Sequence, residues 1–300
     1  MKNMISITDL TADGVKALIR QAIWLKAELK KQGVPKDLRL QNKSMAMIFD
    51  KPSLRTRLSF EVCMTQLGGH AVYLAPADIG LGTRETVHDS AKVISSMADV
   101  IVARVSSHEA VKELAKYSNV PVINAMTDLE HPCQALADLQ TIYEQFGAFK
   151  NIKLAYLGDA HNNVTNSLAL AAELLEMEMT VAAPKGYEMT PQIIKQTPSV
   201  KHCNDPAEAV AGARVVIADT WVSMGKETER AERLKALAPF QVNKKLMARA
   251  DKQAIFMHCL PAYRGKEVTA EVIDGPQSVV FAGAENRLHA QKALVLELLT

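Results

Sequence analysis

The amino-acid sequence predicts an α/β protein of two domains, each a parallel β-sheet flanked by helices. Two observations predict this fold class. Short apolar runs alternate with segments of helical periodicity, as they do in parallel βαβ units. The alternation occurs twice within 300 residues, and a chain of this length is usually too long to fold around one small hydrophobic core. Gly147–Lys150 interrupts the pattern, so we expect a first domain over residues 1–147 and a second over 148–300.

The first half opens with a helix expected over residues 11–32. Thr11 gives a capping signal at its start, and Gly33 with Pro35 ends the apolar periodicity. The expected strands that follow are Ser44–Phe49, Ala71–Ala75, Asp99–Arg104 and Val120–Ala125. The other expected helices of this half are Thr56–Leu67, Glu85–Met97, Ser107–Tyr117 and His131–Phe146.

The second half repeats the pattern without repeating the residues. Its expected strands are Lys153–Gly158, Thr180–Ala183, Val215–Asp219 and Ala254–His258, with a weaker one at Val200–Cys203. Its expected helices are Asn163–Met177, Pro191–Gln196, Pro206–Ala211, Lys244–Ala250 and Glu285–Leu299.

Composition narrows the class of function. Apolar residues make up 48% of the chain and the formal net charge is +2, which predicts no global attraction to nucleic acid or to a membrane surface. No apolar run approaches the roughly 20 residues needed to span a bilayer, and the N-terminus lacks an apolar signal core, so we expect a cytoplasmic protein. The four cysteines are scattered, which favours neither a disulfide framework nor a zinc cluster.

The stretch from Asp50 to Glu61 is the strongest candidate for binding an anion. It leads from an expected strand into an expected helix and carries Ser53, Arg55, Thr56 and Arg57. Helix N-termini present unpaired N–H groups and a favourable dipole, and these side chains add donors. The alternative is a capped helix start in which Arg57 faces solvent or pairs with Glu61. Four donors within five residues favour a phosphate site.

Polar residues also stand where other apolar runs end. They are Arg104, Gly158–Asn163, Asp219–Gly225 and His258–Pro261, together with His131–Gln134 at a helix start. The carboxyl ends of parallel strands gather along one edge of a sheet, so each group should lie near its neighbours. The first half is cationic there, whereas the second mixes Asn, Asp, Ser and Cys. This division fits a dianionic ligand on one half and an aminated partner on the other.

Each of these groups has a simpler explanation when taken alone. Arg104 could form a structural ion pair, His131 could cap a helix, and Asp219 could be an N-cap or turn residue. Cys259 could be a small buried residue, which is common for a free cysteine. Gly158–Asn163 could be an ordinary βα turn, because its single glycine does not make a dinucleotide fingerprint. The combination is more specific than any member.

Five motifs resemble those of the aspartate/ornithine carbamoyltransferase family and occur in its order. The two that resemble the ornithine branch in particular are D-x-W-x-S-M-G and H-C-L-P. The five are Ser53–Arg57, His131–Gln134, Asp219–Gly225, His258–Pro261 and Asn286–Arg287. The resemblance covers nearly the whole chain.

The resemblance implies an enzyme that transfers a carbamoyl group from carbamoyl phosphate to the δ-amine of L-ornithine, releasing L-citrulline and phosphate. It implies a carbamoyl-phosphate-binding domain over residues 1–147 and an ornithine-binding domain over 148–300, with the last helix, 285–299, packing on the first domain. It further implies a role in arginine metabolism, no metal or organic cofactor, and a homo-oligomer that is a trimer or a multiple of trimers.

The resemblance also implies the site residues. Those for carbamoyl phosphate are Ser53, Leu54, Arg55, Thr56, Arg104, His131, Gln134, Cys259, Leu260 and Arg287. Those for ornithine are Asn163, Asp219, Ser223 and Met224, with Asp219 taking the α-amino group. The implied catalytic residues are Arg55, Arg104, His131, Gln134 and Cys259. The family's Leu–Pro bond is cis, so Leu260–Pro261 is expected to be cis.

Two positions depart from the family pattern. Gly80 stands where the family usually carries Gln or His, a residue that reaches the phosphate of a neighbouring subunit. Either that contact is missing here or a nearby residue such as Arg84 supplies it. Leu54 replaces the usual Thr, a milder change because the contact there runs through the backbone.

Three other functions remain open from the sequence. One is a carbamoyltransferase for another amine, such as putrescine or an acylated ornithine. Another is a ligand-binding relative without turnover. The third, a nucleotide-dependent dehydrogenase, is disfavoured because no G-x-G-x-x-G motif is present.

Overall fold

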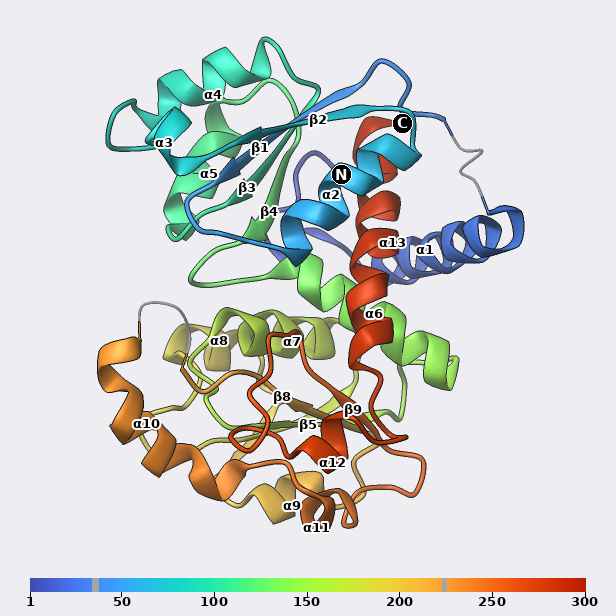
Figure 1. The fold of residues 1–300 in the computed structure, drawn as a ribbon, viewed down its shortest axis with the longest axis vertical. Helices are drawn as coiled ribbons and strands as arrows, with labels where there is room; N and C mark the ends of the chain where they lie inside the picture. Colours follow the sequence, from blue (N-terminus) through green and yellow to red (C-terminus); the bar gives the residue numbers. More distant parts are fainter. Residues whose placement is uncertain (34–37, 223–225) are drawn as a thin grey trace. The chain divides into compact units, whose positions relative to one another are not determined.

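The computed structural model describes residues 1–33, 38–222 and 226–300. The chain divides into two compact units (Figure 1). Unit 1 comprises Met1–Gln140 and Glu285–Thr300, and unit 2 comprises Thr141–Ala284. Most of the C-terminal helix α13 (Val280–Leu299) therefore belongs to unit 1, which confirms the expected return of this helix to the first domain. Among the described helices, none has both the length and the apolar character needed to cross a membrane.

Unit 1 contains a four-stranded parallel sheet in the order β2-β1-β3-β4. Its strands are β1 (Ser44–Phe49), β2 (His70–Leu74), β3 (Val100–Arg104) and β4 (Val122–Met126). Its helices are α1 (Ala12–Gln32), α2 (Arg55–Gln66), α3 (Pro76–Ile79), α4 (Val87–Ser95), α5 (His108–Tyr117) and the first part of α6 (Pro132–Phe146). Figure 1 shows α4 and α5 on one side of this sheet and α2 with α13 on the other.

The order of the strands in unit 1 creates a switch point between β1 and β3. The chain leaves β1 for β2 on one side and then returns to β3 on the other, so the connections after β1 and β3 run to opposite faces of the sheet. Ligands of open parallel sheets bind in the crevice that such a reversal leaves at the carboxyl ends of the strands. The segments after Phe49 and at Arg104 border this crevice.

Unit 2 contains a five-stranded parallel sheet in the order β7-β6-β5-β8-β9. Its strands are β5 (Lys153–Leu157), β6 (Glu178–Ala182), β7 (Lys201–Cys203), β8 (Val215–Ala218) and β9 (Ile255–Met257). Its helices are α7 (Asn163–Leu174), α8 (Pro191–Gln196), α9 (Pro206–Val210), α10 (Arg230–Leu237), α11 (Lys244–Met247) and α12 (Ala270–Ile273). Figure 1 shows α7 and α8 on one side of the sheet, and α9, α11 and α12 on the other. The switch point of this sheet lies between β5 and β8.

The predicted fold class is confirmed, and the differences concern the start of the last helix and several short or polar helices. The last helix begins at Val280, five residues before the predicted start at Glu285. The helix α10 is not predicted by the apolar periodicity because only Arg233 and Leu237 of its residues are buried. The one-turn helices α3 and α12 are too short to show a period.

Candidate functional site

The switch point of unit 1 contains the start of α2. This helix begins at Arg55, and its N-cap residue Leu54 makes no side-chain capping bond. Ser53 and Arg55 are half-buried and Thr56 is buried. The N–H groups of the first turn point toward the crevice end of the helix, where the dipole favours an anion.

Two buried arginines meet at the hydroxyl of Thr56. Arg104, at the end of β3, donates from an Nη to Thr56 Oγ1 at 3.2 Å, and Arg287 of α13 donates to the same oxygen at 3.3 Å. A hydroxyl oxygen has two lone pairs, so the Thr56 O–H remains a donor. We call Thr56, Arg104 and Arg287 the arginine cluster. Two guanidinium groups and a donating hydroxyl in one buried place suit a phosphate or another oxyanion.

Gln134 of α6 and His131, the residue just before this helix, extend the arginine cluster. The side-chain oxygen of Gln134 accepts a hydrogen bond from Arg287 at 2.7 Å, and its amide donates to Asp138 at 3.0 Å. Burial, reinforced by the charges of Arg287 and Arg104, lowers the pKa of His131 well below its ordinary value. His131 is therefore a neutral imidazole at neutral pH, able to donate one hydrogen bond without adding charge.

Asn286 fixes the position of Arg287 on α13. Its side-chain oxygen accepts from Lys26 of α1 at 2.7 Å and from Gln140 of α6 at 3.1 Å. Three helices that are distant in sequence therefore hold the residue next to Arg287. This arrangement places a C-terminal arginine in the unit 1 site.

The switch point of unit 2 presents an acidic group. Asp219 follows β8, and one of its carboxylate oxygens accepts from the Thr220 N–H at 2.7 Å and from the Cys259 thiol at 3.1 Å. Cys259 follows the neighbouring strand β9, so the sheet brings the two motifs together. Leu260 has a φ of +59°, its bond to Pro261 is cis as expected, and its N–H donates to His258 Nδ1 at 2.8 Å.

Of the remaining residues predicted to bind ornithine, only Asn163 lies among the described residues. Asn163 is the first residue of α7, which follows β5 on the other side of the switch point from Asp219. The preceding Asn162 caps this helix through the Thr165 N–H at 2.9 Å. Ser223 and Met224 lie outside the described residues, as does Gly225.

Asp219, His258 and Cys259 are close enough to be considered as metal ligands. One donor atom from each lies within 4.8 Å of the others. Nδ1 of His258 already accepts from the Leu260 N–H, however, and Nε2 lies 3.4 Å from the buried Glu267 carboxylate without a hydrogen bond to any described residue. The hydrogen bond at Nδ1 favours a structural turn over a metal site, and the absence of a metal requirement stays a prediction.

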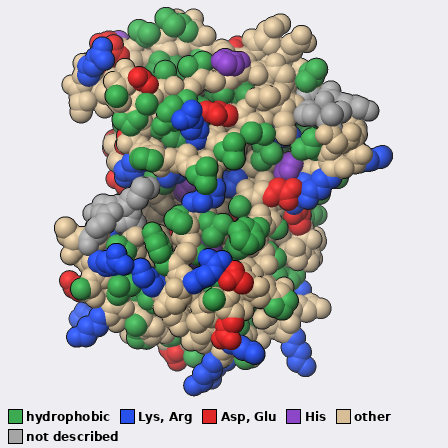
Figure 2. Space-filling model, in the orientation of Figure 1, with side chains coloured by type: hydrophobic (Ala, Val, Ile, Leu, Met, Phe, Trp, Pro, Cys, Tyr) green, Lys and Arg blue, Asp and Glu red, His purple; other side chains and the backbone are tan. Residues whose placement is uncertain are grey.

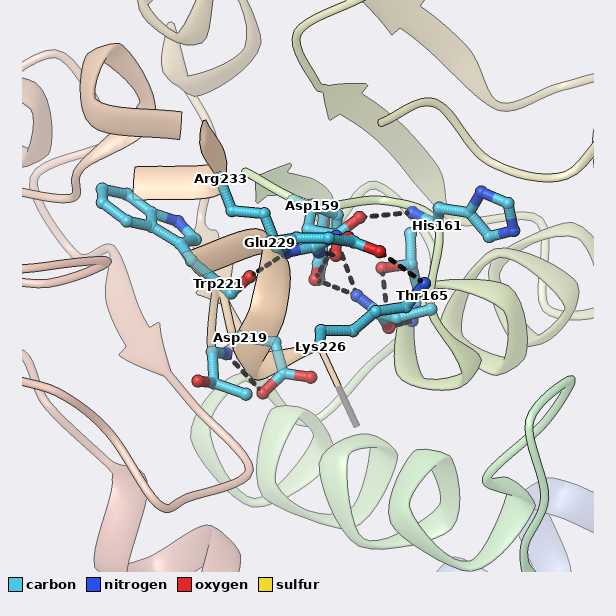
Figure 3. A network of polar contacts seen from close by, with 11 residues as sticks. Asp159, His161, Thr165, Asp219, Trp221, Lys226, Glu229 and Arg233 are labelled. Atoms are coloured by element: carbon cyan, nitrogen blue, oxygen red, sulfur yellow. Dashed lines mark hydrogen bonds and ion pairs between the residues drawn. The ribbon is translucent and has the colours of Figure 1, made fainter. Parts of the chain in front are cut away.

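A buried ion pair near Asp219 was not predicted from the sequence. Asp159, in the turn after β5, pairs with Arg233 of α10 (Figure 3). Arg233 also donates to the Trp221 carbonyl and to Glu229. The sequence contained a signal for Asp159, which stands at a strand end in Gly158–Asn163, but the polar helix that carries Arg233 gave none.

The surface outside these two clusters carries mixed charge. On the face drawn in Figure 2, basic and acidic side chains of the described residues are interspersed among apolar ones. This distribution agrees with the small net charge of +2. Anion binding must therefore depend on local groups such as the arginine cluster.

Two family models match the chain in sequence order. Residues 2–144 match the carbamoyl-P binding domain of aspartate/ornithine carbamoyltransferase. Residues 150–298 match the Asp/Orn binding domain of the same family. Together they cover nearly the whole sequence.

Named relatives of similar length support the same grouping. An ornithine carbamoyltransferase from Archaeoglobus fulgidus is 48% identical over 303 residues, covering 100% of this chain and 98% of the relative. The solved structure of ornithine carbamoyltransferase from Pyrococcus furiosus has a TM-score of 0.93 and 48% identity, covering 99% of this chain and 96% of that one. The anabolic ornithine carbamoyltransferase from Campylobacter jejuni has a TM-score of 0.91 and 40% identity, with 99% of each chain covered.

Proposed function

Because this chain belongs to the aspartate/ornithine carbamoyltransferase family, we propose that it transfers the carbamoyl group of carbamoyl phosphate to the δ-amine of L-ornithine. The products are L-citrulline and phosphate. The observation that carries the choice of amine is the Asp219 carboxylate at the switch point of unit 2. A carboxylate there attracts an amino group and repels a second carboxylate, which favours ornithine over aspartate.

The groups of unit 1 suit carbamoyl phosphate. We propose that Ser53, the Leu54 backbone, Arg55 and Thr56 hold its phosphate at the start of α2, where N–H groups and the helix dipole favour a dianion. Arg104, His131, Gln134 and Arg287 are proposed to hold the carbamoyl end and the bridging oxygen. The neutral His131 suits the uncharged carbamoyl group better than an imidazolium would, because it can donate without adding charge.

The groups of unit 2 suit an amino acid. We propose that Asp219 binds the α-amino group of ornithine, assisted by Asn163, Ser223 and Met224. Cys259 and the Leu260 carbonyl are proposed to lie beside the δ-amine and the carbamoyl group. The Cys259 thiol donates to Asp219 at 3.1 Å and is proposed to orient the carboxylate.

The chemistry requires a neutral amine and a stabilised oxyanion. An alkyl ammonium has a pKa of about 10.4, so the site must favour its deprotonated form. Desolvation beside cationic groups does this, and the departing phosphate can accept the proton. The carbonyl oxygen gains negative charge as the amine attacks, and Arg55, Thr56, Arg104 and His131 are the proposed donors. Phosphate is an activated leaving group, so the reaction as proposed uses no cofactor.

A steady-state assay of the purified protein tests this function. Carbamoyl phosphate is supplied with ornithine, putrescine, an acylated ornithine or aspartate in parallel reactions. We expect citrulline formation with ornithine and little turnover of the other three amines. Faster turnover of putrescine or an acylated ornithine would assign a different substrate, and no turnover of any amine would favour a binding protein.

We further propose that carbamoyl phosphate binds the domain of residues 1–147 and ornithine the domain of residues 148–300. The two family models, which meet between residues 144 and 150, support this division. The similarity to an enzyme described as anabolic supports a role in arginine biosynthesis. A cytoplasmic location stays a prediction.

We propose a homo-oligomer, either a trimer or a multiple of trimers. The family resemblance supports this assembly, and exposed apolar side chains on α2 and on the edge strand β2 agree with it. Leu58 and Val72 expose 55% and 44% of their surface. Mass photometry of the wild type and of Leu58→Glu is the test. A monomeric wild type would contradict the proposal.

The loop at Gly80 decides how a neighbouring subunit could contribute. Gly80 ends α3 with a φ of +53°, and a Cβ atom there would lie 2.8 Å from the Arg84 Cβ, so the turn favours glycine. Arg84 is exposed in the same loop. If Arg84 supplies the cross-subunit phosphate contact, Arg84→Ala raises the KM for carbamoyl phosphate. An unchanged KM would show that Arg84 does not supply the contact.

A further inference from the structure

Arg233 occupies the centre of the polar network drawn in Figure 3. Its side chain is buried on α10, and each arm of the guanidinium has a different partner. Nε donates to the Trp221 carbonyl at 2.6 Å, one Nη donates to Glu229 at 3.1 Å, and the other pairs with the Asp159 carboxylate. The planar guanidinium fixes the directions of these three contacts relative to one another.

The position of Trp221 is fixed from a second side. Gly158 at the end of β5 has a φ of +115°, and a Cβ atom there would lie 3.0 Å from the indole nitrogen of Trp221. The indole therefore packs directly against the backbone after β5, while Arg233 holds the carbonyl. Trp221 is buried and stands two residues after Asp219.

The Asp219 carboxylate depends on this short segment. Its Oδ1 accepts from the N–H of Thr220, the residue between Asp219 and Trp221. The Trp221 carbonyl lies two peptide units after the Thr220 N–H, so we expect a shift of this carbonyl to reach the Asp219 carboxylate through the backbone. The position of the acid is therefore linked to Arg233 through the backbone.

Asp159 is the anchor for Arg233. It is buried, one carboxylate oxygen accepts from the His161 N–H at 3.0 Å, and its backbone carbonyl accepts from Tyr156 at 2.9 Å and Asn162 at 2.6 Å. Burial raises the pKa of Asp159, and the charge of Arg233 opposes that rise. The anchor is thus rigid, and a guanidinium tied to it cannot move far.

We propose that Arg233 is a positioning residue that fixes the Asp219–Trp221 segment, so that the Asp219 carboxylate is correctly placed for the amino group of the substrate. This inference rests on the proposed function, because it concerns the same ornithine site. Arg233 acts through the backbone and need not touch the substrate. The chemical class of group that it helps to select is an α-ammonium group.

The first test removes both buried charges together. The double variant Arg233→Met, Asp159→Asn leaves no unpaired buried charge, and the amide oxygen introduced at position 159 can still accept from the His161 N–H. We expect a folded protein by circular dichroism, with the KM for ornithine raised about ten-fold or more, as expected when a charge-assisted hydrogen bond is misplaced. The KM for carbamoyl phosphate should change less than about two-fold, because unit 1 binds that substrate.

The second test keeps the positive charge at position 233 and changes the geometry of the group that carries it. Arg233→Lys can pair with Asp159, but one ammonium cannot also hold Trp221 and Glu229 in the directions of a guanidinium. We expect a raised KM for ornithine here too. Arg230→Met, which removes an exposed arginine from the same helix, is the matched control and should behave as the wild type.

Each outcome decides the proposal. A wild-type KM for ornithine in the folded double variant, or in Arg233→Lys, would show that neutralising Asp159 is the only role of Arg233 and would overturn it. An equal rise in both KM values would also overturn it, because it would indicate general damage to the protein. If the wild type forms no citrulline, the proposed function fails and this inference fails with it.

Discussion

The two sheets of this protein use the same topological device and collect opposite charges at it. In unit 1 the switch point between β1 and β3 gathers buried cations, with Arg104 and Arg287 sharing the Thr56 hydroxyl. In unit 2 the switch point between β5 and β8 gathers acids, Asp159 and Asp219. The topology specifies where a ligand binds, and the residues at the strand ends specify its charge.

The two sites also differ in how their charges are balanced. In unit 2, Arg233 neutralises Asp159, which leaves Asp219 as the acid available for a ligand. In unit 1, Arg104 and Arg287 both donate to the neutral Thr56 hydroxyl, so two positive charges lie close together. Both guanidinium groups attract an anion at this place, whereas the Asp219 carboxylate attracts a cation.

Replacing Arg55 with alanine should have the largest effect. Arg55 opens α2 at the unit 1 switch point, and the loss of one oxyanion donor typically lowers kcat about 10²–10³-fold. The rate of citrulline formation measures this, with circular dichroism to establish that the variant folds. Arg57→Ala is the control, since Arg57 is exposed and pairs with Glu61 at 2.8 Å. Equal losses in the two variants would contradict an anion role specific to Arg55.

Replacing Asp219 with asparagine should affect the binding of ornithine but not the binding of carbamoyl phosphate. The variant keeps an oxygen that accepts from Thr220 and Cys259 but loses the charge that attracts an amino group. A charge-assisted hydrogen bond is worth about 1.5–3 kcal/mol, so we expect the KM for ornithine to rise roughly 10–10²-fold. The KM for carbamoyl phosphate should remain near the wild-type value. A comparable rise in both would argue against a contact with the α-amino group.

The sequence predicts most of what the switch points contain, because motif residues follow the ends of apolar runs. The runs ending at Phe49, Arg104 and Ala218 are visible from apolar content alone, and each parallel sheet must bring the ends of its own strands to one edge. The pairing of Asp219 with Cys259 then follows from the adjacency of β8 and β9.

What the sequence does not reveal are contacts made by polar helices. The helix α10 lacks an apolar stripe, and a buried arginine looks like an exposed one in sequence. Some contacts depend on distances between elements that are remote in the chain. Arg104 and Arg287 both donate to the Thr56 hydroxyl, and Lys26 donates to Asn286. Periodicity carries no information on such distances.

Replacing His131 should change how the free energy of unfolding depends on pH. The folded-state pKa of His131 lies below its unfolded value of about 6.5, so below that pH the unfolded chain binds the extra proton. The free energy of unfolding of the wild type therefore falls by up to about 1.4 kcal/mol per pH unit from this residue alone as the pH drops below about 6.5.

Urea denaturation at about pH 7.5 and about pH 5.5 measures this effect, because only the lower value lies below the unfolded pKa. His131→Asn should lose less stability than the wild type between the two conditions. His70→Asn, an exposed histidine on β2, should keep the wild-type pH dependence. An identical decline in the wild type and His131→Asn would show that His131 accepts a proton in the folded state.

The smallest effect should come from replacing Gly147 or Gly158 with alanine. Comparing the two variants distinguishes the effect of backbone strain from the effect of displacing Trp221. Gly147 and Gly158 both have positive φ values, +70° and +115°, so alanine strains either turn, by about 1–2 kcal/mol at Gly147 and by more at Gly158, whose φ lies outside the left-handed α region. Only at Gly158 would the new methyl group meet Trp221; at Gly147 it would meet nothing within 4 Å.

Thermal unfolding should therefore show both variants destabilised, whereas only Gly158→Ala should raise the KM for ornithine, by roughly three- to ten-fold. Because the arginine cluster lies in unit 1, the KM for carbamoyl phosphate should be unchanged in both. Equal KM values for ornithine in the two variants would mean that the Asp219 carboxylate tolerates movement of Trp221, and the unit 2 site would then be less rigidly positioned than its hydrogen bonds indicate.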